Sequence, residues 1–162
     1  MNIPTPLQER LQFLARVTER EVQHLQSTDA SLFAFEFTPE RVAKLPADQS
    51  LAEQVDAFVS RFGRLQDTVG DKVLPAWREA VGERPGTMAD NLDRAERLGL
   101  VASSDQWLSL RKLRNRMIHD YIEDPSILAD ALQTAHMHVP LLTQTADAFL
   151  MDLRKRGILP GS

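Results

Sequence analysis

The sequence predicts an all-α fold, a mostly antiparallel helical bundle of four long helices plus a short one, in a single domain over residues 1–162. Apolar residues recur three or four positions apart along most of the chain, as on the buried face of a helix. Helix start and stop signals interrupt that pattern, and no alternating run is long enough to build a sheet. Apolar residues make up 43% and charged residues 26% of the chain, which is typical of a globular protein with room for a core.

Two long helices are predicted in the first half of the chain, with an irregular segment between them. The first covers about 6–28, and the second begins near Ser50 and is kinked or ended by Pro75, with a short continuation around Trp77. Residues 29–48 contain two prolines and the run FAFEF, whose alternating phenylalanines are too few for a sheet, so this segment is predicted to be irregular. The apolar seams of the two helices are Leu7, Leu11, Leu14, Val17, Val22 and Leu25, and Leu51, Val55, Phe58, Phe62, Leu65 and Val69.

The second half of the chain is predicted to contain a short helix followed by two long ones. Thr87 caps the short helix, which follows the loop ERPG and ends at Gly99. Either Ser103 or Ser104 caps the next helix. Asp124 caps the last helix, which has a proline at its first position and a second, internal proline that is expected to kink it.

Composition and charge exclude several classes of function. The net charge of −4 argues against broad, sequence-independent adhesion to nucleic acid, so a polyanion would have to meet a local basic cluster. The absence of cysteine excludes disulfides, thiolate metal sites and a cysteine nucleophile, and it is consistent with a reducing compartment. The N-terminus lacks a signal-peptide pattern and no stretch is apolar enough to span a membrane, so we expect a cytoplasmic protein.

One residue interrupts the apolar seam of the penultimate long helix. Trp107, Leu110, Met117 and Tyr121 follow the spacing of a core-facing seam, and the missing member of that series is Arg114. A guanidinium cannot lose its charge, so burying it alone would be costly. Three interpretations remain: a structural ion pair or an arginine that extends its head to water, a groove at a subunit interface, or an anion site.

Side chains capable of acid–base chemistry follow this arginine on the same helix. Asn115 and His119 are four positions apart, so they are stacked on one flank of the helix. His119 also lies near the helix C-terminus, where the helix dipole favours a protonated imidazole. Tyr121 is two turns from Arg114 along a single line. Each has a simpler explanation: a histidine that bonds free carbonyls at a helix end, and a core aromatic with its hydroxyl at the rim.

Other charged residues have both a functional and a structural interpretation. Arg111, Lys112 and Arg116 add positive charge beside the arginine, although a solvated helix face explains them as well. Asp67 lies beside the seam of the second long helix and could orient a catalytic group or simply be solvated. The two histidines of HMH at 136–138 point in different directions from a helix, so they make a poor metal pair and no metal is predicted.

The run RNRMIHDY, which starts at Arg114, resembles the R-x4-H-x-Y signature of HepT-like toxins in the HEPN superfamily. Arg114, His119 and Tyr121 match that signature one for one, and Asn115 matches the polar residue often found after the arginine. The segment RFGRLQDTVGDKVLP at 61–75 is similar to the second helix of the family, and the all-helical order agrees over most of the chain.

This resemblance implies a metal-independent endoribonuclease that needs no cofactor and works as a homodimer, with the two motifs facing a shared cleft. Arg114 and His119 would be catalytic, Asn115 would support them, and the neighbouring basic residues would contact RNA. The family pairs with an MNT-type nucleotidyltransferase antitoxin, which would transfer AMP to Tyr121. The alternative is a non-catalytic helical module that binds a nucleotidyltransferase, with Arg114 serving only the interface.

Overall fold

The computed structural model describes residues 3–119 and 124–161, and it confirms the predicted all-α class: no strand occurs among the described residues. None of the described helices is both long and apolar enough to cross a membrane. The helical elements are α1 (Thr5–Leu32), α2 (Pro39–Ala43), the 3₁₀ turn η1 (Leu45–Ala47), α3 (Gln49–Asp67), the π-helix η2 (Thr68–Val73), α4 (Leu74–Ala80), α5 (Met88–Arg97), α6 (Ser104–His119) and α7 (Pro125–Lys155).

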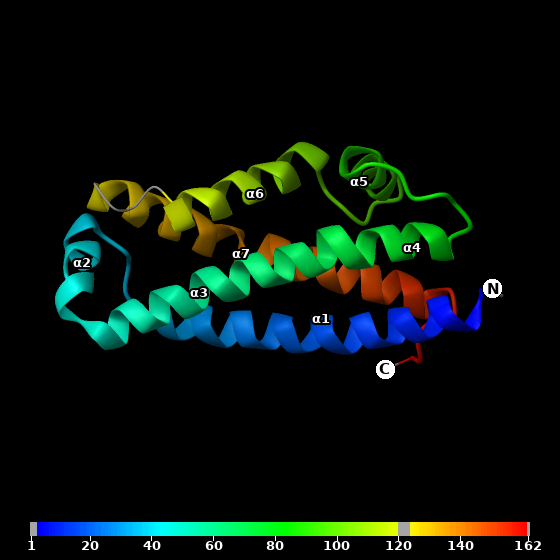
Figure 1. The fold of residues 1–162 in the computed structure, drawn as a ribbon, viewed down its shortest axis with the longest axis horizontal. Coiled ribbons are helices and arrows are strands. Elements are labelled where there is room, and N and C mark those ends of the chain that lie inside the picture. The colour runs from blue at the N-terminus through cyan, green and yellow to red at the C-terminus, as the bar shows by residue number, and fades with distance from the viewer. Residues whose placement is uncertain (1–2, 120–123, 162) are drawn as a thin grey trace.

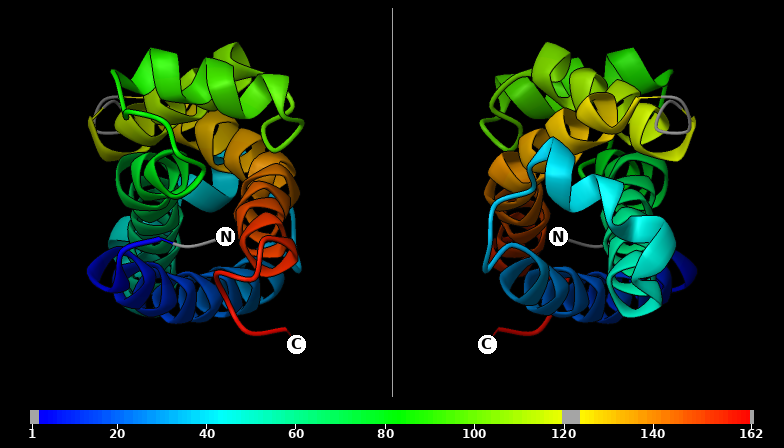
Figure 2. Two further views of the ribbon diagram at one scale, coloured as in Figure 1. Left: turned by 90° about the vertical axis from the view of Figure 1, so that its right-hand side faces the viewer. Right: turned by 90° about the vertical axis from the view of Figure 1, so that its left-hand side faces the viewer.

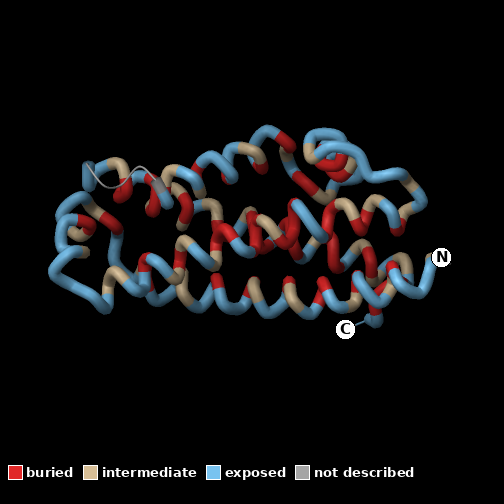
Figure 3. The backbone as a smooth tube through the Cα atoms, in the orientation of Figure 1, coloured by how far each residue is buried: buried red, intermediate tan, exposed pale blue. Residues whose placement is uncertain are grey.

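The long helices lie side by side along one axis (Figure 1). α3, η2 and α4 follow one another as a continuous rod that runs antiparallel to α1, and α7 also runs antiparallel to α1. α6 runs antiparallel to α3 and α7 and covers them on the side opposite α1 (Figure 2). The buried residues of these helices face one another between the rods, while the exposed residues cover the outside (Figure 3).

The predicted helix ends agree with the capping groups of the structure. Thr87 forms a capping box at the start of α5, and Gly99 follows that helix with a φ of +78°, which a glycine adopts without strain. Ser103, rather than Ser104, accepts a hydrogen bond from the backbone N–H three residues later, so it caps α6. Asp124 accepts a hydrogen bond at the start of α7 as predicted.

The prediction that 29–48 is irregular was only partly correct. α1 continues to Leu32, and the segment also contains α2 and η1. Thr38 caps α2 by accepting a hydrogen bond from the next turn, and a proline at the first helical position supports it. Arg41 then fixes the FAFEF run, because its guanidinium donates to the carbonyl of Phe35 at 2.6 Å and lies 4.1 Å from the centre of the Phe37 ring.

The second long helix is interrupted close to Pro75 and continues as a short helix that contains Trp77, as predicted, but the interruption precedes the proline. Pro75 lies in the first turn of α4, and the departure from α-helical bonding comes before it, in η2. There the N–H of Leu74 donates to the carbonyl of Val69, five residues back. Widening one turn accommodates the missing proline N–H without ending the rod. α7 likewise remains helical on both sides of Pro140.

Two glycines set how closely α6 approaches the rod of α3 and η2. A Cβ atom on Gly63 would lie 2.5 Å from Nε of Arg114, and one on Gly70 would lie 3.2 Å from Nε1 of Trp107. The glycines are seven residues apart, and so are the two side chains that cover them in the antiparallel direction. Each large side chain of α6 therefore occupies space that a side chain on the opposite helix would need.

Candidate functional site

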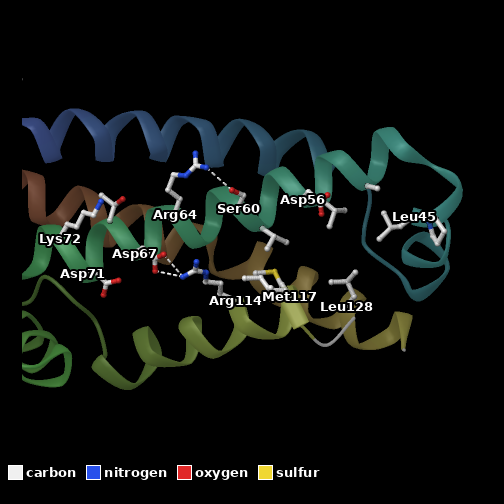
Figure 4. Close-up of a pocket in the computed structure, with 16 residues that line it drawn as sticks. Leu45, Asp56, Ser60, Arg64, Asp67, Asp71, Lys72, Arg114, Met117 and Leu128 are labelled. Carbon is white, nitrogen blue, oxygen red and sulfur yellow. Dashed lines mark hydrogen bonds and ion pairs between the residues drawn. The ribbon is translucent and has the colours of Figure 1, made fainter. Parts of the chain in front are cut away.

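Arg114 lies in a groove between α3 and α6, and an acidic residue of α3 holds it there (Figure 4). Its Nη1 donates hydrogen bonds to both carboxylate oxygens of Asp67, at 2.7 and 2.8 Å. The arginine side chain is 32% exposed and the aspartate side chain 38%. A pair this exposed contributes at most about 1 kcal/mol to stability, so its main effect is to fix the direction of the guanidinium.

The geometry assigns Asp67 a partner and shows how Arg114 is accommodated on an apolar seam. Asp67 is paired rather than simply solvated, and it orients the arginine that the sequence analysis singled out. Gly63 leaves the space in which the arginine side chain crosses α3. Nε of Arg114 lies against Gly63, and the arginine side chain as a whole lines the groove.

The groove has a volume of about 1060 Å³ and extends from η2 past α6 to η1. Its half next to η1 is mainly apolar, and its half next to η2 is mainly charged (Figure 4). The apolar half includes Val55, Val59, Met117, Ile118 and Leu128. Among the described residues, the charged ones that line the groove are Asp56, Arg64, Asp67, Asp71, Lys72 and Arg114. Three cations thus accompany three carboxylates, which gives the described lining of the groove a mixed rather than strongly positive character.

A half-buried carboxylate on α1, that of Glu21, contacts a residue that lines the groove. Thr68, which lines the groove, donates through Oγ1 to the two carboxylate oxygens of Glu21 on α1, at 2.6 and 3.1 Å. Burial raises the pKa of Glu21, and the hydrogen bond from Thr68 and the charges of Arg64 and Lys72 oppose that shift. This contact joins α1 to the first residue of η2.

The motif residues that follow Arg114 are only partly described. The described part of α6 ends at His119, and the residues that follow it, 120–123, lie outside the described residues. The side chain of His119 and the whole of Tyr121 lie outside the described residues. The predicted roles of these two residues therefore remain predictions.

The predicted supporting and RNA-binding residues lie on the outer face of α6. Asn115, Arg111 and Lys112 are exposed and do not line the groove. Arg116 also lies outside the groove, and its Nη2 is 3.4 Å from a carboxylate oxygen of Asp130. Within the described residues, α6 thus brings one predicted basic residue, Arg114, into the groove. Arg64 and Lys72, which sequence analysis missed, supply the other cations.

The histidines of the HMH run contact separate partners. His136 lies 2.7 Å from a carboxylate oxygen of Asp29 through Nδ1, and its ring stacks on Phe33 with centroids 4.3 Å apart. His138 Nδ1 instead lies 2.8 Å from the carbonyl of Thr134. Among the side chains that the structure describes, which do not include that of His119, no three histidine, aspartate or glutamate side chains gather in a way that could hold a metal.

Comparisons with known proteins leave the resemblance to HepT-like toxins resting on the motif. No model of a known protein family matches the chain, and neither curated proteins nor solved structures give a significant match.

Proposed function

We propose that this protein is a metal-independent endoribonuclease, the toxin of a type II-like HEPN/MNT toxin–antitoxin pair in the cytoplasm. Its helical bundle would then be HEPN-like, and its active site would be composite, formed where two copies of α6 face a shared cleft. The observation that carries the proposal is the placement of Arg114. It is oriented by Asp67, partly exposed in a groove, and on the same helix as His119.

A shared site solves a geometric problem within one chain. Arg114 and His119 are five positions apart on one α-helix, so the two side chains diverge by about 140° and are poorly placed to act on one phosphate. A twofold axis would bring two arginines and two histidines to the same cleft. One histidine would take the proton of a ribose 2′-hydroxyl, whose oxygen attacks the phosphorus, while the other protonates the departing 5′-oxygen. The products are a 2′,3′-cyclic phosphate and a 5′-hydroxyl.

Charge stabilisation would be the task of the arginine. Negative charge builds on the phosphorane as the 2′-oxygen attacks, and guanidinium donors already aimed at that position stabilise it. Asp67 restricts Arg114 to one orientation, so little reorganisation is needed when RNA binds. In the same scheme, a nucleotidyltransferase antitoxin neutralises the toxin by transferring AMP to Tyr121, because a bulky anion beside the site would exclude RNA.

The test is cleavage of RNA by the purified, unmodified protein in the presence of EDTA. We expect cleavage, a cyclic phosphate end, and a loss of at least about 100-fold in His119→Ala with an unchanged circular dichroism spectrum. Full activity in a folded His119→Ala protein would rule out this mechanism.

One observation favours a second candidate, a non-catalytic helical module that binds a nucleotidyltransferase. Asp67 neutralises Arg114, and the charged residues of the groove balance one another, which suits an interface as well as an anion site. This candidate predicts a stable complex with the nucleotidyltransferase and no cleavage of RNA by the purified chain.

A further inference from the structure

An exposed apolar side chain lies one turn beyond Arg114 in the same groove. Ile118 is 40% exposed and lines the groove, so its apolar side chain is accessible from that groove. The contacts of α6 with Gly63 and Gly70 fix the register of α6 against α3, and extending that register by one turn places Val59 opposite Ile118. Both residues line the groove, so its two walls each present an aliphatic side chain at this level.

We propose that this pair of aliphatic walls is a subsite for one unpaired base of single-stranded RNA, whose phosphate lies at Arg114. The inference deepens the proposed function and rests on it. The phosphate and its base are held by adjacent parts of one groove, because Ile118 is four residues, or about 6 Å, further along α6 than Arg114. Met117 and Leu128 also line the groove and are otherwise buried, and a methionine makes favourable contacts with aromatic rings.

The charges of the groove favour a base subsite over a track for phosphates. Among the described residues, three carboxylates accompany three cations in the groove, and one of the carboxylates, Asp67, is already bound to the arginine. A strand cannot therefore be held mainly by its phosphates, and burial of apolar surface must supply much of the affinity. A base in a duplex is stacked and paired, so it could not enter between the walls without being unpaired. The subsite thus selects single-stranded RNA.

The experiment measures binding of RNA, so its result does not depend on whether the chain also cleaves RNA. The protein carries His119→Ala throughout, and fluorescence anisotropy gives the affinity for a labelled RNA pentanucleotide and for the same ribose-phosphate chain without bases. We expect Ile118→Ala to weaken binding of the base-containing strand about fivefold to tenfold, the effect of removing a few buried apolar carbons. Binding of the abasic strand should not change.

Leu98→Ala is the matched control, because Leu98 is 41% exposed and lies outside the groove. Leu98→Ala should leave both affinities unchanged. If Ile118→Ala fails to fold, Val59→Ala on the opposite wall takes its place, and it should weaken binding of the base-containing strand alone. Equal losses for the two strands, no loss for the base-containing strand, or duplex RNA bound as tightly as single-stranded RNA would each overturn the subsite. Absence of cleavage by the wild-type chain would instead count against the proposed activity.

Discussion

Substituting alanine for Gly63 should destabilise the protein through Arg114 alone. The added Cβ would lie 2.5 Å from Nε, 3.0 Å from Cδ and 3.1 Å from Cζ, and these three nearest atoms all belong to Arg114. Alanine in a helix is more favourable than glycine by about 1 kcal/mol. Displacing a packed side chain typically costs about 1–3 kcal/mol, and breaking the exposed pair with Asp67 adds at most about 1 kcal/mol. These contributions sum to a net loss of about 0–3 kcal/mol, and we expect a value near the middle of that range, about 1–2 kcal/mol.

The assay is urea unfolding followed by circular dichroism, at one protein concentration because a dimer would make stability concentration-dependent. The control is the same substitution in an Arg114→Ala background. There the clash is absent, and Gly63→Ala should stabilise the fold by about 0.5–1 kcal/mol. The resulting coupling of about 2 kcal/mol exceeds the error of additivity, about 0.5 kcal/mol. If Gly63→Ala destabilises both backgrounds equally, the added Cβ does not clash with Arg114, and Gly63 is not what leaves room for the arginine side chain.

Three further predictions concern assembly, control and pH. Light scattering should show a dimer at micromolar concentrations, and a monomer that cleaves RNA would refute a shared site. Tyr121→Phe should retain RNase activity but gain no AMP from the nucleotidyltransferase, as measured by intact mass, and continued modification would place the switch elsewhere. Burial raises the pKa of Glu21, so the folded chain takes up a proton more readily than the unfolded chain and ionisation of Glu21 costs stability. The stability gained by Glu21→Gln should therefore be absent below about pH 4, where the carboxyl is protonated in both states, and should grow until the pH exceeds the raised pKa of the folded state; a difference that is the same at every pH would contradict it.

Local patterns in the sequence were sufficient to predict the helices. The seam of α3, the capping residue Thr87 and the stop at Gly99 each depend on neighbours within a few positions, and the structure has them as predicted. The segment 29–48 was less predictable, because α2 is held by the contacts of Arg41 with Phe35 and Phe37. Those contacts depend on how the chain turns rather than on periodicity.

The part of the candidate site that lies on α6 could be predicted from the sequence, but the residues of the opposite helix that contact it could not. The arginine on an apolar seam marked Arg114 from the sequence, whereas its partner Asp67 had no local signal beyond lying beside a seam. Gly63 and Gly70 do carry a signal, since two glycines seven residues apart on a predicted helix indicate a close approach by another helix. Only the tertiary structure shows that the helix that approaches these glycines is α6.

The contact between Gly70 and Trp107 gives the molecule an optical probe of its own. The indole Nε1 of Trp107 is buried without a hydrogen-bond acceptor in the described part of the chain, whereas Nε1 of Trp77, the other tryptophan, donates to Asp152 at 2.7 Å. Trp107 is on the same helix as Arg114, two turns away, so a ligand that shifts α6 changes the surroundings of this indole. In a Trp77→Phe protein, the emission of a single fluorophore would report movement of α6 without any label attached to the groove.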